Sequence, residues 1–237
     1  MEYGTMLGDS FEYAKEAVWG KWMKWILLVI SSIIFPLILG YVMEIYRGPK
    51  PAPELKNWGR LFIDGLKYLV AWIIYMIPVI VVIMVFGGFA FFSVAEQAAM
   101  SGDPDFFINN IDELMPLVGT FFLGLFIAVI LGIIISLFAY IGVIRMARTD
   151  RFGEAFNFSG ILETIRGIGW GNYILALIVL FVVMVVLAII LAIIGSIPFI
   201  GWIIYLFLIP LLTLFQARYM VQVYEAGTPA AQAMVQG

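Results

Sequence analysis

The sequence predicts an all-α integral membrane protein, a polytopic helical bundle with about five transmembrane helices and additional amphipathic in-plane helices. Of its 237 residues, 64% are hydrophobic and only 12% are charged, whereas a soluble domain is about half apolar and about one quarter charged. The chain also contains several long stretches without a single charged residue. A soluble fold of this composition would expose large apolar patches, and lipid is the solvent that removes this cost.

The uncharged stretches are long enough to cross the core of a bilayer, which takes about 20 apolar residues of helix. The longest, from Gly167 to Ala217, exceeds one crossing, and two glycines and a proline between residues 195 and 201 mark a break. None of the stretches shows the period of two that barrel strands require. We expect one helical membrane domain over residues 1–226, followed by a short disordered tail over 227–237. The expected spans are about 23–46, 68–93, 115–144, 172–195 and 199–221.

Three further stretches are amphipathic, because their apolar residues recur at the spacing of one helix face. We expect each to be a helix in the interface plane; the alternative is that each is the water-exposed end of a span. The second face lies opposite Arg60, Asp64 and Lys67, and Asp9 is placed to cap the first helix. The three apolar faces are Leu7, Phe11, Ala14 and Val18; Trp58, Leu61, Phe62, Leu66 and Leu69; and Phe158, Ile161, Leu162 and Ile165.

Lysines and arginines gather in two of the connecting loops, which the positive-inside rule places on the inner side. The loop between the second and third spans has five acidic residues and no basic one, so we expect it outside. The C-terminus of this multi-pass cell-membrane protein then lies inside. Anionic lipids attract basic residues near the inner leaflet. The expected inner-leaflet contacts are Arg47, Lys50, Lys56, Arg60, Lys67, Arg145, Arg148, Arg151 and Arg166.

The same count of basic residues places the N-terminus outside, although the N-terminal part of the chain carries Lys15, Lys21 and Lys24. In an alternative topology, Pro36 breaks the first apolar stretch into a re-entrant hairpin and the N-terminus lies inside. Irregular backbone at that depth requires cover by protein or by a cavity. A single continuous helix satisfies its own backbone more simply, so the straight helix is the main prediction.

Small residues recur at every fourth position in two spans, which lets helix backbones approach closely. We interpret these stripes as helix packing within one chain, with a dimer seam as the alternative. Prolines inside three spans can kink their helices, and broken helices line binding sites in many transporters. The stripes are Gly124, Ala128, Gly132 and Ser136, then Ala188, Ala192 and Ser196; the possible kinks are Pro36, Pro78 and Pro210.

The sequence offers no catalytic constellation. It contains neither cysteine nor histidine, which removes thiol catalysis, thiolate metal sites and the commonest general base. The span centres carry no ionisable residue, so a proton relay or a charge-coupled pump is not expected. There is no glycine-rich phosphate loop with its lysine, and a net charge of −3 gives no sign of nucleic-acid binding. We therefore expect no enzyme activity, cofactor or metal.

Several short segments carry a resemblance to a known family. They are Gly40-Tyr41, Arg47-Gly48, Pro53-Glu54 with Trp58, Asp64-Gly65-Leu66-Lys67, Tyr75 with Pro78, and the run from Arg151 to Phe156. In these segments the chain resembles the archaeal membrane family called domain of unknown function 4013, over about residues 10–225. One departure is Pro-Ala-Pro-Glu-Leu at residues 51–55, where the family more often has a Pro-Glu-Phe type of entry. The resemblance implies origin and membrane location, and no mechanism.

The leading functional hypothesis is a non-catalytic membrane protein, acting as a scaffold, an accessory subunit or a lipid-organising element. Its partners would be membrane lipids, a second copy or another membrane protein. The alternative is a permease or channel for a small, weakly charged solute that uses the proline-kinked helices. A third hypothesis, a lipid-modifying enzyme, requires inner acidic residues to converge with the loop arginines. Those acidic residues are Glu54, Asp64, Asp150, Glu154 and Glu163.

Overall fold

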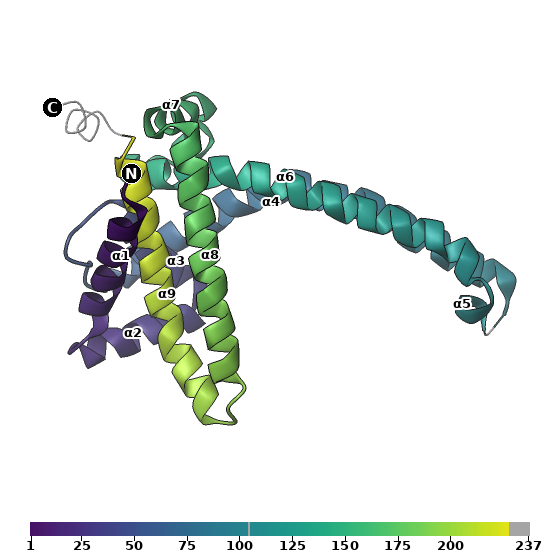
Figure 1. Ribbon diagram of the computed structural model, residues 1–237, viewed down its shortest axis with the longest axis horizontal. Coiled ribbons are helices and arrows are strands. Elements are labelled where there is room, and N and C mark those ends of the chain that lie inside the picture. The colour runs from purple at the N-terminus through teal and green to yellow at the C-terminus, as the bar shows by residue number, and fades with distance from the viewer. Residues whose placement is uncertain (104, 228–237) are drawn as a thin grey trace. The chain divides into compact units, whose positions relative to one another are not determined.

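The computed structural model describes residues 1–103 and 105–227, the Glu113 side chain excepted, and every regular element in this part of the chain is a helix (Figure 1). The all-α prediction is therefore confirmed. Two compact units form: residues 72–139 make one, and the chain before and after them makes the other. The elements are α1 (Tyr3–Val18), α2 (Trp22–Ile33), α3 (Phe35–Tyr46), α4 (Trp58–Ser101), α5 (Phe106–Asn109), α6 (Ile111–Thr149), the 3₁₀ helix η1 (Phe152–Phe156), α7 (Phe158–Ile168), α8 (Trp170–Gly195) and α9 (Ile200–Glu225).

Four of the described helices, α4, α6, α8 and α9, are long and apolar enough to cross a membrane, and a fifth crossing results if the pair α2–α3 counts as one span. The prediction of a multi-pass helical protein is confirmed. Large apolar side chains lie exposed on these helices, for example Ile178 and Phe181 on α8. Exposed apolar surface of this extent suits a lipid environment. All but Gly227 of the tail predicted over 227–237 lies outside the described residues.

The first apolar stretch is not the straight helix that we expected over residues 23–46. Helix α2 ends at Ile33, α3 begins at Phe35, and the two are bent by 120°. Pro36 lies in the first turn of α3, where its missing N–H group has no helical partner to lose. The break thus falls where the alternative topology placed it, and the bent pair is either a broken span or a re-entrant segment.

The second amphipathic stretch also differs from the main prediction. Residues 58–69 form no separate helix but the first turns of α4, so here the alternative, the end of a span, is correct. Burial does not follow the two faces: Leu61 is 2% exposed and the Asp64 side chain is 3% exposed, whereas Phe62 and Leu66 are each 41% exposed. Asp64 is buried because basic side chains of the same unit hold it, Arg47 among them.

The first and third amphipathic stretches do form separate helices, α1 and α7. Helix α7 ends at Gly169, whose φ of +87° favours glycine, and it buries Ile161 and Ile165. Asp9 is not the cap of α1, because the helix begins at Tyr3 and the N-cap residue is Glu2. The position of α1 and α7 in the interface plane stays a prediction.

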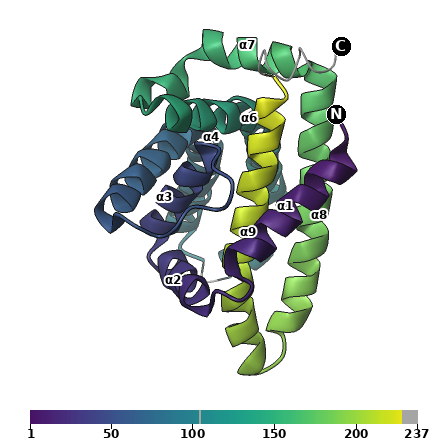
Figure 2. The ribbon, with the colours of Figure 1, turned by 90° about the vertical axis from the view of Figure 1, so that its left-hand side faces the viewer.

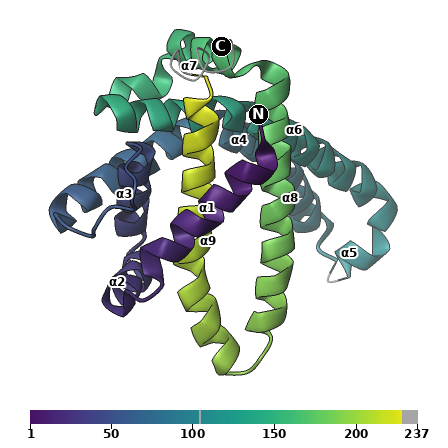
Figure 3. The same ribbon diagram turned by 60° about the vertical axis from the view of Figure 1, so that its left-hand side comes forward.

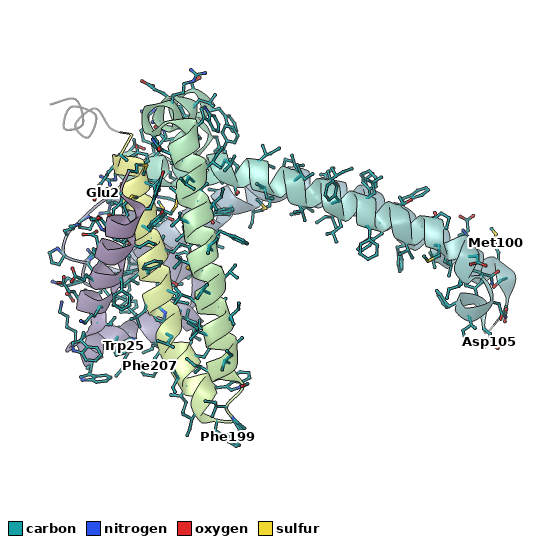
Figure 4. All side chains as sticks on the ribbon, viewed as in Figure 1. Glu2, Trp25, Met100, Asp105, Phe199 and Phe207 are labelled. Atoms are coloured by element: carbon teal, nitrogen blue, oxygen red, sulfur yellow. The ribbon has the colours of Figure 1, made fainter. Side chains whose placement is uncertain are left out.

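In the second unit, the later part of α4 and the earlier part of α6 form a helical hairpin (Figures 1 and 4). A Cβ atom added to Gly124 would overlap the Cβ atom of Phe86, and one added to Gly132 would lie 3.9 Å from Val79. Ala128, between them on the same stripe, is buried. The small residues of α6 therefore lie against α4 of the same chain.

In the first unit, α1 runs obliquely along α9, and α8 lies beside α9 (Figures 2 and 3). The Tyr219 hydroxyl on α9 donates a hydrogen bond to the Ala176 carbonyl on α8 at 3.1 Å. The Gln222 amide on α9 donates to the Met6 carbonyl on α1 at 3.0 Å and to the Ser10 hydroxyl at 2.8 Å. These bonds fix the positions of α1 and α8 along the axis of α9.

Two glycines let α3 and the first turns of α4 meet backbone to backbone. A Cβ atom added to Gly40 would overlap the Leu61 carbonyl, and one added to Gly65 would overlap the Pro36 carbonyl. The two contacts lie one helical turn apart on each helix, so the glycines face each other along one seam. Any larger residue at either position would force the two helices apart.

We predict that Gly40→Ala and Gly65→Ala each lower the free energy of unfolding by about 1–3 kcal/mol, the usual cost of overpacking a tight contact. Unfolding of the detergent-solubilised protein by heat or denaturant measures the change. Gly59→Ala on the same helix is the matched control, because an added Cβ there meets no atom within 4 Å. Equal stability of the Gly65→Ala and Gly59→Ala variants would contradict the close approach.

Candidate functional site

Three groups of charged side chains in the first unit join different elements of the chain, and the largest surrounds Arg47. The Arg47 guanidinium, just after α3, lies 2.6 Å from the Asp64 carboxylate, 2.9 Å from that of Glu44 and 3.2 Å from that of Asp150. The Lys67 amine lies 3.1 Å from Asp64. The guanidinium of Arg60 approaches Asp64 to 3.6 Å, completing what we call the Arg47 cluster: Glu44, Arg47, Arg60, Asp64, Lys67 and Asp150.

The glycine seam brings this cluster together. Asp64 immediately precedes Gly65, whose backbone lies against Pro36, so the carboxylate is carried to the end of α3, where Arg47 follows Tyr46. Gly48 continues the chain at a φ of +90°, and a side chain there would collide with the Arg148 guanidinium. Three of the five inner acidic residues do pair with loop arginines: Asp64 and Asp150 with Arg47, and Glu154 with Arg145. Both oxygens of Asp64 are occupied by basic partners.

The second group, the Asp9 cluster, consists of Asp9, Lys50 and Arg218 and joins α1 to α9. The Asp9 carboxylate accepts a hydrogen bond from Lys50 at 2.7 Å and one from Arg218 at 2.9 Å. The Arg218 guanidinium, which is 5% exposed, also lies over the Tyr13 ring, an arrangement that attracts a cation. Burial alone would raise the pKa of Asp9, but Lys50 and Arg218 lower it below its ordinary value.

The third group fixes the end of α6 to its surroundings. Arg145 pairs with Glu154 of η1 at 2.7 Å, and hydrogen bonds from Arg145 and Asn157 lower the pKa of Glu154. Arg148 donates to the Tyr46 carbonyl at 2.6 Å and pairs with Glu225 at 2.6 Å. All three groups are ion pairs within one chain, and such pairing stabilises a fold without supplying a free nucleophile or base.

The surfaces that α1 and α8 form on the first unit differ in polarity at the same level along α9. The Trp25 indole, after the turn that follows α1, donates to the Phe207 carbonyl at 2.9 Å (Figure 4), whereas Asp9 pairs with Arg218. From Phe207 to Arg218, α9 advances by eleven residue steps, or about 16 Å, so α1 descends along the uncharged part of α9. Over this interval α1 exposes Glu12, Lys15 and Glu16.

The opposite side, formed by α8, is apolar over the same interval. Ala176 is level with Tyr219 because the two are hydrogen-bonded, and α8 then exposes Ile178, Phe181 and Val185 in its next turns. We call the two surfaces the α1 side and the α8 side. Residues 199–221 are expected to span the membrane, and an exposed carboxylate or ammonium group in contact with hydrocarbon is costly. At that expected depth the α8 side suits lipid and the α1 side does not.

A hollow of about 590 Å³ adjoins the α1 side where α1 turns into α2. Its lining includes Lys21, Lys24, Glu54 and Lys56. Lys24 is buried and donates to the Ala52 carbonyl at 3.1 Å, and it pairs with Glu54 at 3.3 Å. Tyr41 holds the same loop by donating to the Pro53 carbonyl at 2.6 Å. The polar surface of the α1 side therefore includes the proline-rich loop as well as the helix.

The structure brings together only some of the residues singled out from the sequence. The stripe on α6 lies against α4, whereas Ala188, Ala192 and Ser196 lie exposed on or just beyond α8. Pro36 breaks a helix, but α4 and α9 continue through Pro78 and Pro210. Among the nine basic residues expected at the inner leaflet, those paired with carboxylates are Arg47, Lys50, Arg60, Lys67, Arg145 and Arg148, and those exposed outside these pairs are Lys56, Arg151 and Arg166.

Sequence reasoning missed the Asp9 cluster and the charged α1 side. Asp9 and Arg218 are 209 residues apart, and no local pattern connects them. Two signals were present: Arg218 is the only charge at the end of the last span, and Asp9 lies on the face of its helix that also carries buried residues. A buried charge needs a partner, so each of these residues implied the other.

These features define a multi-pass helical membrane protein whose buried charges pair within the chain. The family model described as "Protein of unknown function (DUF4013)" matches residues 25–196, and the chain belongs to this family. The resemblance found in the sequence is thereby confirmed, while an archaeal origin stays an expectation. No curated protein and no solved structure matches the chain.

We predict that Asp64→Asn lowers the free energy of unfolding by about 3 kcal/mol, because removing one partner of a buried ion pair leaves the other uncompensated. Arg47 keeps Glu44 and Asp150 nearby, so the loss falls at the low end of the usual range. Chemical denaturation in detergent measures it. Glu163→Gln on the exposed face of α7 is the control and should change stability by less than about 0.5 kcal/mol.

The lowered pKa of Asp9 predicts a loss of stability in acid. Because the folded-state pKa lies below the unfolded value of about 3.9, the contribution is complete at pH values above the unfolded pKa. It disappears as the pH falls through the folded-state pKa. Melting temperatures measured between neutral pH and about pH 3 should fall less steeply for Asp9→Asn than for the native chain. Parallel curves for the two proteins would refute the role of this pair.

Proposed function

We propose that this protein is a non-catalytic membrane scaffold or accessory subunit, which acts by holding another membrane-embedded protein surface against its α1 side. The observation that carries the proposal is the difference between the two sides of one unit at one depth. Over the interval of about 16 Å given by the helical rise, the α8 side exposes apolar residues and the α1 side exposes charged ones. A protein surface can satisfy those charges, whereas lipid cannot.

The charged groups inside the unit support the same conclusion. The carboxylates of Asp9, Asp64 and Glu154 accept from basic side chains of the chain itself, so they serve the fold. A lipid-modifying enzyme would need acidic groups free to exchange protons with a substrate. Among the scaffold, accessory and lipid-organising roles, a charged side at membrane depth favours the two roles in which a protein is the partner.

A channel is the second candidate, and the charged surface of the α1 side supports it as well. Charged side chains at membrane depth also suit contact with water, and the break between α2 and α3 resembles the discontinuous helices of transporters. The two candidates differ in what covers the α1 side. In a scaffold the cover is protein, whereas in a channel it is a water-filled path.

Labelling of single cysteines separates the candidates, since the chain has no cysteine of its own. Phe11→Cys reports on the α1 side and keeps every charge in place; Ile178→Cys reports on the α8 side and Glu163→Cys on the exposed face of α7. In opened native membranes treated with a charged maleimide, we expect rapid labelling at position 163 and slow labelling at positions 11 and 178. Position 11 should react rapidly once the protein is purified away from its partner.

Rapid labelling of Phe11→Cys in native membranes would overturn the scaffold proposal and favour the channel. In that case we expect small solutes to enter liposomes that contain the purified protein, and a flux assay measures this. Slow labelling at position 11 in membranes, with rapid labelling after purification, supports a protein cover that detergent removes.

A further inference from the structure

We infer that the partner on the α1 side is a second copy of this chain, which docks through the exposed face of α1 to form a symmetric dimer. This inference rests on the proposed function and names the partner that the proposal leaves open. Two-fold pairs are the commonest oligomers, and in them one patch must be complementary to itself. The charges on the exposed face of α1 are complementary to those on a second copy of the same face, and the shape of the face permits close docking.

The charges of this face alternate in sign. Glu12, Lys15 and Glu16 are exposed, and within the described part of the chain none of the three takes part in an ion pair. When two copies of α1 cross antiparallel about a two-fold axis between Glu12 and Lys15, the lysine of each copy meets Glu12 of the other. A face of one sign would repel its own copy, so the mixed signs favour self-association over a uniformly charged partner.

The shape of the face fits a helix of the same kind. Gly4 and Gly8 lie on the side of α1 that carries Lys15, and a Cβ atom added to either would meet no atom within 4 Å. Glycine inside a helix is unfavourable relative to alanine, and packing within the described chain does not explain these two. Small residues four apart let a second helix approach closely, and they lie one and two turns before the charged residues.

Exposed aromatic side chains complete the face. Phe11 is 62% exposed and lies on the side of α1 that carries Gly8 and Lys15. Trp19, which directly follows the helix, is 70% exposed. Aromatic residues are enriched at the centres of protein interfaces, where charged residues that remain are paired. On this face, Phe11 lies one turn from Lys15, so an apolar contact and an ion pair would form together.

The test cross-links Phe11→Cys to itself in native membranes with a short bifunctional maleimide. We expect a covalent adduct with the mass of two chains, and none from Ile178→Cys on the α8 side. Adding Lys15→Glu to the Phe11→Cys chain should reduce the adduct by about tenfold or more, because like charges then face each other across the axis. The triple reversal Glu12→Lys, Lys15→Glu and Glu16→Lys should restore it.

The outcomes separate this inference from the proposed function. The inference that the partner is a second copy fails if the adduct contains a different protein, or if the two-chain adduct persists in the Lys15→Glu variant. In either case the scaffold role stands. Rapid reaction of position 11 with the charged maleimide in native membranes overturns the scaffold role itself, and the inference of a second copy fails with it. Because the three charged residues are exposed, their substitution should leave the melting temperature of the detergent-solubilised monomer unchanged, and that measurement accompanies each variant.

Discussion

The first unit depends on the contact between Gly40 on α3 and Gly65 on α4. Because neither residue has a side chain, the Leu61 and Pro36 carbonyls lie where a Cβ atom would be, and Asp64 reaches the Arg47 guanidinium at 2.6 Å. Removing a carboxylate from water is costly unless it is paired and hydrogen-bonded. The glycine seam provides the geometry that makes the pairing possible, and the rest of the Arg47 cluster assembles around it.

The charged residues of the protein fall into two classes with different consequences. Those of the Arg47 and Asp9 clusters have partners within the chain, so they specify how its helices pack. Glu12, Lys15 and Glu16 lie outside such pairs, at a depth where α8 presents Ile178 and Phe181. The paired interior charges serve the fold, and the exposed charged side favours a role in assembly, because a protein partner can satisfy charges that lipid cannot.

Sequence reasoning predicted the helices well, because apolar stretches of spanning length have few stable alternatives in lipid. For residues 58–69 it identified an amphipathic helix but not the side chains that lie against the protein. Periodicity shows that one face is apolar, but which residues are covered depends on the neighbouring elements: Leu61 of the apolar face and Asp64 of the charged face are buried, whereas Phe62 is exposed. The break at Pro36 was visible as an alternative. The pairing of Asp9 with Arg218 was not, since it joins residues 209 positions apart.

That long separation has a consequence for how the chain matures. A membrane protein is synthesised from its N-terminus and its early segments fold first, yet the carboxylate of Asp9 pairs with a guanidinium on α9. Helix α1 therefore stays undocked while the helices between α1 and α9 are inserted. The arrival of α9 closes the unit by supplying Arg218, Gln222 and the Phe207 carbonyl together.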